Sequence, residues 1–338
     1  PTLGVVSGEL WVLWCQSGGP GELEGAWLSR LDAPDAKWRH ERLTWGGKAK
    51  PVVDGTAWRV FPTQNLYRLR SGRILAPVNL TAGPAPDALE LGVPKGFFAG
   101  TKRTTVLYSD DEGESWQVSP GNILPPHTWA GWEPTVWEEP DGTVRMFARF
   151  NVHPDTTGID PMSSEYLLTA TSSDGGATWT DLAPVPLETV CSRMYVFPAD
   201  GRGVWNPAGP NDDFTDRLML MVHNDAPGKD LTWAGGRRNI ALYLNRGGGF
   251  DFVAGNGLTG FEEEVAYPQT WVHGDTMLMA YTESNVSPRS IRVTRVRPLP
   301  DPELRYLMPR NNLWPKQLPP APPGRAPDTG ALRFSRVP

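Results

Sequence analysis

Short runs rich in Val, Leu, Tyr, Trp and Thr recur along the chain, and turns built from Gly, Pro, Asp and Asn separate them. A helical pattern, with apolar residues three and four positions apart, is hard to find. Short β-rich runs with turn signals between them are typical of a protein made of strands. The sequence therefore predicts an all-β fold, and the regular spacing points to internal repeats.

One eight-residue pattern, Ser-x-Asp-x-Gly-x-x-Trp, occurs at residues 109–116 and 172–179. Residues 245–252 form a degraded copy that lacks the Asp, and residues 29–38 form a candidate fourth copy with an insertion. In a β-turn the Asp carboxylate can accept backbone N–H bonds, the Gly takes a positive φ and the Trp packs back onto the sheet. We therefore expect the Asp of each octet to be structural rather than catalytic.

Each octet closes a module with a fixed order of elements: an inner strand, a Gly turn, a second strand, a long loop and a third strand. The clearest module has strands at 133–137, 144–149 and 166–171 before its octet. The other modules are one around Gly8 and three that begin near Thr63, Arg193 and Tyr267. Five modules of about four short strands each predict a β-propeller, in which four-stranded sheets repeat radially.

The direction of the strands decides which residues share an edge of a sheet. Since neighbouring strands alternate in direction, the start of the inner strand, the end of the second and the start of the third lie at one edge, and the octets lie at the other. The residues that this rule places at the first edge are Glu133, Arg193 and Tyr267 at inner-strand starts, Asn79, Arg149, Asp225 and Glu283 at second-strand ends, and Arg237 at a third-strand start. Several arginines converge there, and the arginine fork binds carboxylates through two hydrogen bonds. We therefore expect a ligand that carries a carboxylate.

The charge balance argues against binding to nucleic acid, because 32 Lys and Arg residues face 38 Asp and Glu residues, for a net charge of −6 without a basic block. The longest apolar runs, such as 218–222, fall far short of the ~18 residues of a membrane-spanning helix. Cys15 and Cys191 cannot form a metal cage by themselves, and the histidines lack the spacing of a zinc site. We expect no cofactor, no metal and no membrane span.

The two octets, the segment 133–149 and the segment 266–271 together resemble the sialidase (neuraminidase) superfamily of Asp-box proteins, over about residues 8–297. The resemblance implies a β-propeller of sialidase type, in which six blades are usual. Two alternatives stay open for the five visible modules: a sixth blade assembled from residues 298–338 and the N-terminus, or a five-bladed variant.

We expect residues 1–338 to form a single propeller domain. Within it, residues 298–338 are expected to form a Pro-rich strap. Residues 331–337 are expected to form a closing strand that ties the two ends of the propeller together.

The resemblance implies catalytic roles for Tyr267 and Glu133. Sialidases are glycosidases with a tyrosine nucleophile. A neutral phenol can approach a substrate carboxylate that would repel a carboxylate nucleophile, and a nearby base must take its proton because the pKa of free tyrosine is about 10. We expect Tyr267 to be the nucleophile and Glu133 its base. Asp87, Glu24 and Glu22 are the candidate acids for protonation of the leaving group.

Carboxylate binding is expected of Arg149 and Arg237, with Arg193 and Arg59 as further candidates. The family's first arginine stands in an Arg-Ile-Pro motif, whose place in this sequence would fall before Pro1. Residues 58–62 are a loose echo of that motif one module later, and the replacement of this arginine by Arg59 stays open.

The leading hypothesis is an exo-acting glycoside hydrolase of sialidase type that releases a terminal acidic sugar, with sialic acid as first choice. Two alternatives stay open: a polysaccharide lyase or glycosidase acting on uronic-acid glycans, and a non-catalytic carbohydrate-binding propeller in which Trp129, Trp132 and Trp271 stack on sugars. The expected partner is a glycan with a terminal carboxylate sugar. Because the chain opens with Pro1 and has no signal-like apolar segment, we expect processing of what precedes it, and a secreted or periplasmic protein.

Overall fold

The computed structural model describes most strands of the 338-residue chain and the turns of its N-terminal half. The described residues are 1–16, 25–53, 55–64, 66–82, 101–119, 131–139, 141–150, 166–181, 183–188, 194–198, 219–224, 240–245, 252–257, 265–273, 276–283, 290–298 and 334–337. At some strand ends, that of Arg149 included, only the backbone is described. The chain divides into two compact units, of which the first holds two sheets and most of a third, and the second holds a fourth and a fifth.

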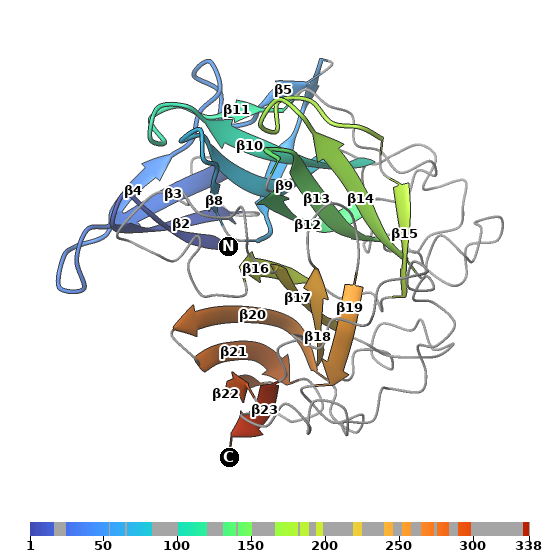
Figure 1. Cartoon of the computed structure of the whole chain (residues 1–338). Helices are drawn as coiled ribbons and strands as arrows, with labels where there is room; N and C mark the ends of the chain where they lie inside the picture. The colour runs from blue at the N-terminus through green and yellow to red at the C-terminus, as the bar shows by residue number, and fades with distance from the viewer. Residues whose placement is uncertain are drawn as a thin grey trace. The chain divides into compact units, whose positions relative to one another are not determined.

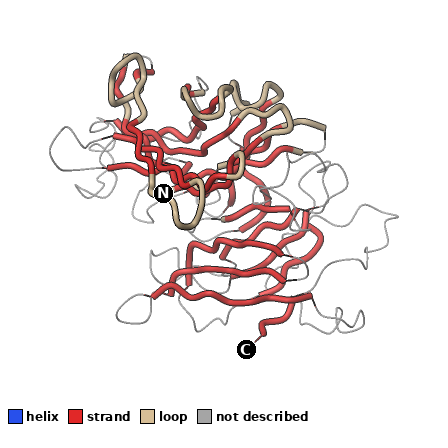
Figure 2. The backbone as a smooth tube through the Cα atoms, turned by 90° about the vertical axis from the view of Figure 1, so that its left-hand side faces the viewer, coloured by secondary structure: helices blue, strands red, loops and turns tan. Residues whose placement is uncertain are grey.

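All regular structure in the described residues is β-strand, and Figure 2 shows strands joined by loops with no helix among the residues that it colours. The prediction of an all-β protein is confirmed. It follows that, over this part of the chain, there is no helix with the length and apolar character needed to cross a membrane.

In the first unit, antiparallel strands follow one another in chain order within each sheet (Figure 1). The first sheet contains β1 (Thr2–Val6), β2 (Glu9–Gln16), β3 (Gly25–Leu31) and β4 (Arg39–Arg42). The second contains β7 (Arg59–Pro62), β8 (Tyr67–Arg68), β9 (Ile74–Ala82), β10 (Thr101–Ser109) and β11 (Gln117–Val118), and a small ladder of β5 (Val52–Val53) and β6 (Thr56–Ala57) precedes it. The third, most of which belongs to this unit, contains β12 (Gly131–Glu138), β13 (Val144–Phe150), β14 (Tyr166–Ser172) and β15 (Ala183–Glu188).

The second unit repeats this arrangement in two further sheets. The fourth sheet contains β16 (Tyr195–Pro198), β17 (Met219–Asn224), β18 (Ile240–Asn245) and β19 (Phe252–Gly257). The fifth contains β20 (Val265–His273), β21 (Thr276–Glu283), β22 (Ser290–Pro298) and β23 (Phe334–Val337). Among the described residues, the five sheets of four or five strands correspond one to one to the five predicted modules.

Two details of the strands differ from expectation. The inner strand of the second sheet is split into β7 and β8, which both pair with β9. The predicted closing strand exists as β23, which pairs with β22 as the outer strand of the fifth sheet; its expected role in tying the two ends together stays a prediction. Since β1 pairs with β2 in the first sheet, the described terminal strands do not assemble into a sixth sheet.

The first two sheets pack against each other through buried apolar side chains. Trp11, Leu13 and Leu28 of the first sheet and Ile74 and Val78 of the second are each exposed by 2% or less. Along β1, buried and half-buried residues alternate, as expected for a strand with one face in a core. This core of the first unit therefore lies between the first and second sheets.

Candidate functional site

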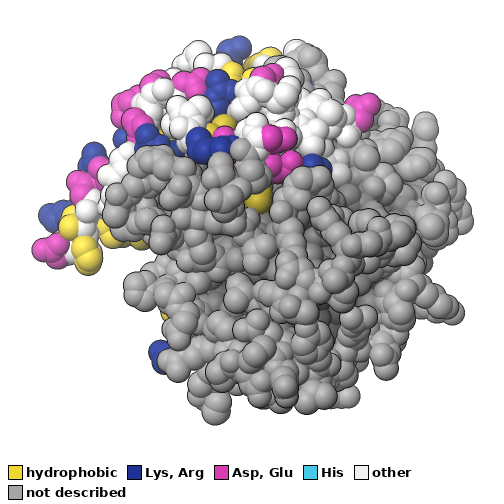
Figure 3. Space-filling model, viewed as in Figure 1, with side chains coloured by type: hydrophobic (Ala, Val, Ile, Leu, Met, Phe, Trp, Pro, Cys, Tyr) yellow, Lys and Arg dark blue, Asp and Glu magenta, His cyan; other side chains and the backbone are white. Residues whose placement is uncertain are grey.

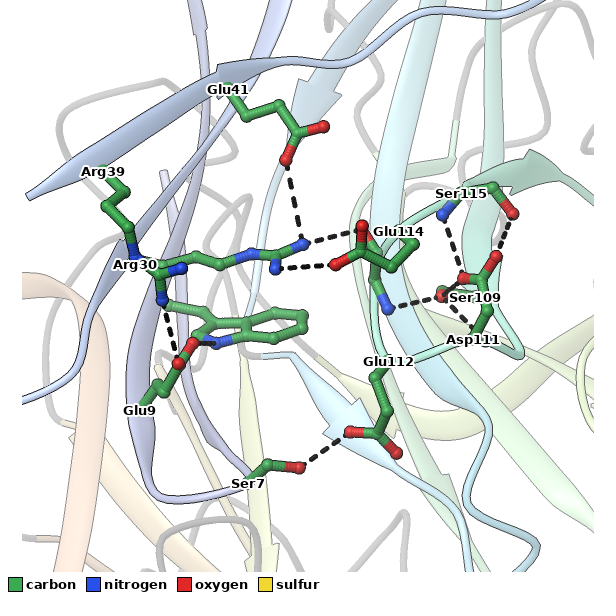
Figure 4. Close-up of polar contacts among 12 residues, drawn as sticks. Ser7, Glu9, Arg30, Arg39, Glu41, Ser109, Asp111, Glu112, Glu114 and Ser115 are labelled. Carbon is green, nitrogen blue, oxygen red and sulfur yellow. Dashed lines mark hydrogen bonds and ion pairs between the residues drawn. The ribbon is translucent and has the colours of Figure 1, made fainter.

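The first octet forms a turn between β10 and β11 that its own side chains close (Figure 4). Ser109 donates from its hydroxyl to Asp111 Oδ1 at 2.8 Å and accepts the Gly113 N–H at 2.8 Å. Asp111 accepts the backbone N–H of Ser115 at 2.9 Å and its hydroxyl at 2.5 Å. The Trp116 indole, which is 5% exposed, donates to the Gly113 carbonyl at 3.1 Å. The turn thus satisfies its polar groups locally.

The second octet, between β14 and β15, repeats these bonds. Ser172 donates to Asp174 Oδ1 at 2.7 Å and accepts the Gly176 N–H at 2.8 Å. Asp174 accepts the Thr178 N–H at 2.8 Å and its hydroxyl at 2.6 Å, and Trp179 Nε1 donates to the Gly176 carbonyl at 3.1 Å. The expected structural role of the Asp in these two octets is confirmed.

The same hydrogen bonds hold both Asp side chains in their ionised form. The hydroxyl and N–H of Ser115, with the Ser109 hydroxyl, lower the pKa of Asp111 to about 2. Burial raises the pKa of Asp174, but the bonds from Thr178 and Ser172 outweigh it, so that the net shift is downward. Carboxylates that stay ionised and fully engaged at neutral pH are poorly suited to donate a proton in catalysis.

Arginines from the preceding sheet bind the backbone of each octet. Arg30 on β3 donates to the Gly113 carbonyl at 2.9 Å and lies 4.5 Å from the ring centroid of Trp11. Arg73, in the turn before β9, donates to the Gly175 carbonyl at 3.2 Å. Over the described part of the face shown in Figure 3, basic and acidic side chains are interspersed. We call the end of the sheets that carries the octets the octet edge. Polar groups at this edge connect neighbouring sheets.

The candidate fourth octet at residues 29–38 is wrong, because the turn between β3 and β4 is built differently. Ser29 Oγ accepts the Trp14 Nε1–H at 2.8 Å and lies 2.8 Å from His40 Nδ1. Trp38 is 41% exposed rather than packed onto the sheet. The degraded octet at 245–252 lies outside the described residues except at its two ends.

At the opposite end of the third sheet, strand pairing brings the backbones of two predicted site residues together. Arg149 on β13 pairs with Trp132 on β12, the neighbour of Glu133. At the other end of β13, Val144 pairs with Ser172 on β14, the first residue of the second octet. The rule from strand direction is therefore confirmed for this sheet. We call the end with Glu133 the bulge edge.

The fifth sheet has the same arrangement within the second unit. Val265 at the start of β20 pairs with Glu283 at the end of β21, and Tyr267 follows two residues later. The Glu283 carboxylate binds the Arg292 guanidinium and accepts the Ser290 hydroxyl at 3.2 Å. Its charge is thus already paired within the sheet.

Glu133 and Tyr267 share an unusual backbone. Each has a left-handed conformation, with φ of 54° at Glu133 and 58° at Tyr267, and each directly precedes a proline. The pairing shifts by one residue at both places, between Trp132 and Thr135 and between Ala266 and Gln269, which marks a β-bulge. A left-handed non-Gly residue is uncommon, a residue before proline favours extended backbone, and such strain costs about 1–3 kcal/mol. Both residues were predicted from the sequence as site residues, but their backbone strain was not.

Side chains of the second sheet hold the bulge at Glu133. Its backbone N–H donates to Asn79 Oδ1 at 2.8 Å, and Asn79 Nδ2 donates to Thr104 Oγ1 at 3.0 Å. The next carbonyl, of Pro134, accepts the Thr63 hydroxyl at 2.9 Å. Asn79 is 0% exposed. Its predicted place at the end of the second strand is therefore corrected: it is a buried supporting residue inside β9.

Of the remaining predicted site residues, Arg59 is among those that the structure describes. Arg59 stands at the start of β7 opposite Thr81, with an exposed side chain. The others lie outside the described residues: Asp87, Glu24, Glu22, Arg193, Arg237, Asp225 and the side chain of Arg149. Their predicted roles stay predictions.

A cavity of about 760 Å³ lies beside the outer strands β4 and β11 in the first unit, lined by residues 41–46, 51–53 and 114–118. Its lining contains none of the predicted catalytic or carboxylate-binding residues, so we do not assign it to the candidate site. Over the described parts of the chain, no three His, Cys, Asp or Glu side chains are grouped so that they could hold a metal ion.

Comparison with known proteins gives a family match. The family model described as a BNR repeat-like domain matches residues 2–279. Among curated protein sequences, none matches this chain.

Several solved structures resemble the chain at low sequence identity. The leech intramolecular trans-sialidase, complexed with 2,7-anhydro-Neu5Ac, has a TM-score of 0.53 and 15% identity over 81% of this chain and 36% of its own. Trypanosoma rangeli sialidase with sialic acid has a TM-score of 0.55 and 17% identity over 86% of this chain and 43% of its own. A Dyadobacter fermentans protein of unknown function has a TM-score of 0.54 and 16% identity over 87% of this chain and 74% of its own. The chain thus spans less than half the length of the first two proteins.

Proposed function

The chain belongs to the BNR repeat-like domain family and has the sialidase-type β-propeller fold, and from this premise we propose that it is an exo-acting glycoside hydrolase that releases a terminal acidic sugar, with sialic acid as first choice. One observation carries the proposal: Tyr267 and Glu133 occupy the same strained position before a proline in two different sheets. Strain of this kind concentrates at active sites. The names of the leech and T. rangeli proteins support the substrate class.

In the proposed complex, arginines bind the sugar carboxylate. Arg149 and Arg237 are the principal candidates, with Arg193 and Arg59 as further ones. The backbone position of Arg149 beside Glu133, at the bulge edge of the third sheet, supports its part in this role. Because a guanidinium stays charged at every working pH and binds a carboxylate through two bonds, it fixes the sugar ring as well as attracting it.

Catalysis would proceed in two displacements. Tyr267 Oη attacks the anomeric carbon while Glu133 accepts the phenol proton, and the bond from that carbon to the glycosidic oxygen breaks. The leaving oxygen takes a proton from Asp87 or Glu24. Water, which gives a proton back to that acid, then attacks the anomeric carbon, and Tyr267 leaves and regains its proton from Glu133. The net reaction is hydrolysis of one glycosidic bond.

A covalent trap tests the nucleophile directly. One structure of T. rangeli sialidase holds 2,3-difluorosialic acid as a covalent intermediate. We expect this reagent to add one glycosyl group to the peptide that contains Tyr267, detected by mass spectrometry, and Tyr267→Phe to abolish the adduct. Tyr108→Phe is the matched control, because the Tyr108 hydroxyl is exposed and bonds to Gln117 at 2.7 Å on the second sheet. An adduct that persists in Tyr267→Phe would refute the assignment.

Hydrolysis of a panel of aryl glycosides tests the substrate class. We expect release of the aryl group from a sialoside, and a loss of about 10³-fold or more in kcat for Tyr267→Phe, as for other catalytic nucleophiles. An unsaturated product from a uronic-acid glycan would indicate a lyase instead. Retention of a sugar without turnover would indicate a binding protein.

A further inference from the structure

The peptide between Glu133 and Pro134 is held on both sides by buried side chains of the second sheet. Asn79 Oδ1 accepts the Glu133 N–H at 2.8 Å, and the Thr63 hydroxyl donates to the Pro134 carbonyl at 2.9 Å. Asn79 is 0% exposed and Thr63 is 5% exposed. We call these two side chains the bulge clamp. The first bond joins residues that are 54 positions apart in sequence, and the second joins residues that are 71 positions apart. Side chains of the second sheet therefore hold the backbone of the third.

The orientation of the Asn79 amide is determined by its partners. A backbone N–H can only donate, so the atom of Asn79 that faces Glu133 must be its oxygen. The amide nitrogen then faces Thr104 Oγ1, at 3.0 Å, where a hydroxyl can accept. Thr63 is fixed in turn, because its own N–H donates to the Pro77 carbonyl at 3.1 Å. Each clamp side chain therefore has a second bond outside the bulge, from Asn79 Nδ2 to Thr104 Oγ1 and from the Thr63 hydroxyl to the Pro77 carbonyl at 3.1 Å.

We propose that Asn79 and Thr63 are positioning residues for catalysis, which act by holding Glu133 in the left-handed backbone that sets the direction of its side chain. This inference rests on the function proposed above, in which Glu133 is the base. Without the clamp, a residue before proline relaxes toward extended backbone, and its Cα–Cβ bond then points elsewhere. A misplacement of a catalytic group by about 1 Å is enough to lower the rate by about 10²-fold.

The clamp bonds also join two sheets, so a purely structural role has to be separated from positioning. Ser119 offers the matched control, because its buried hydroxyl donates to the Ala177 carbonyl at 2.8 Å and so joins the second octet to the second sheet. Ser119→Ala removes a bond of the same kind at the octet edge. A structural role alone predicts the same effects on activity from both sites.

The experiment compares Asn79→Leu, Asn79→Asp, Thr63→Val and Ser119→Ala in the full chain, with an aryl sialoside as substrate. We expect kcat to fall by about 10- to 100-fold in Asn79→Leu and Thr63→Val, with KM within about 3-fold of wild type. The acidic limb of the pH profile should shift in these two variants, because the proton acceptor is displaced. Asn79→Asp should recover part of kcat, since it keeps an acceptor for the Glu133 N–H. Ser119→Ala should keep both kcat and the profile.

Three results would overturn the inference. One is a kcat in Asn79→Leu and Thr63→Val no lower than in Ser119→Ala, and another is a rise in KM at unchanged kcat. The third is failure of both clamp variants to fold while Ser119→Ala folds, since the clamp would then serve stability. Wild-type protein that hydrolyses no aryl glycoside of an acidic sugar would remove the proposed function itself, which the wild-type assay reveals before any variant is made.

Discussion

Two glutamates of the first unit share a left-handed backbone, with φ of 56° at Glu112 and 54° at Glu133, but the surroundings of the two residues differ. Glu112 lies in the first octet, where the second octet has Gly175 at φ 69°. Its carboxylate binds the Arg68 guanidinium and accepts the Ser7 hydroxyl at 2.7 Å, in an exposed setting. Glu133 lies inside a strand, before a proline, and its backbone is held by the buried Asn79.

The strain at Glu112 has a local cause, and the strain at Glu133 does not. At Glu112 the turn itself demands a positive φ, and a surface ion pair favours glutamate over glycine there. At Glu133 neither the strand nor the following proline favours a positive φ, and side chains from another sheet maintain it. Strain that local sequence does not require is the kind that points to function.

Neutralising Glu133 at the bulge edge and Glu112 at the octet edge should produce the largest difference in activity between the two edges. We expect Glu133→Gln to lower kcat by about 10²- to 10⁴-fold, the range for loss of a general base, with little change in stability. Glu112→Gln should stay within about 2-fold of wild type. Both values come from hydrolysis of an aryl sialoside, with thermal unfolding as the check of folding. Equal effects of the two variants would abolish the distinction between the edges.

The octet edge should respond in stability rather than in activity. Trp116→Ala removes an indole that is 5% exposed and should lower the free energy of unfolding by about 3–5 kcal/mol. Trp38→Ala is the matched control, because Trp38 is 41% exposed, and it should change the free energy by no more than about 0.5 kcal/mol. Urea unfolding measures both. Similar values for the two would show that the octet Trp is not part of the core.

A smaller effect tests the left-handed turn. Gly175→Ala should lower the free energy of unfolding by about 1–2 kcal/mol, because left-handed backbone usually costs a residue with a Cβ that much energy. A Cβ there would meet Leu69 Cδ1 at 3.4 Å and Arg73 Nη1 at 3.5 Å, which is tight but not prohibitive. Glu112→Gly should change stability by less than about 1 kcal/mol, because relief of strain offsets a lost surface ion pair. A large loss in Glu112→Gly would contradict the view that its strain is local.

The smallest effect is the acid response of the octet. The folded state lowers the pKa of Asp111 from 3.8 to about 2, so this group stabilises the protein above its unfolded pKa and the contribution is lost as the pH falls toward 2. We expect wild-type unfolding free energy to drop more steeply over this interval than that of Asp111→Asn. Parallel pH curves for the two proteins would argue against the hydrogen bonds to the Asp111 carboxylate.

The sequence predicted what short-range chemistry determines. The octets formed as expected because Ser109, Asp111 and Trp116 bond within their own eight residues. The left-handed backbone at Glu133 was not predicted, because extended conformations are the norm before proline and the stabilising bond comes from 54 positions away. The role of Asn79 was missed for the same reason: only the packed sheets show that its amide is buried. The roles expected of Arg193 and Arg237 stay predictions.

The pairing of β23 has a practical consequence for work with this protein. Its four residues complete the outer ladder of the fifth sheet, although a long segment separates them from β22 in the chain. A proteolytic nick in that intervening segment would leave the last strand joined to the fifth sheet without a covalent link, so the two fragments should copurify under native conditions and separate in denaturant.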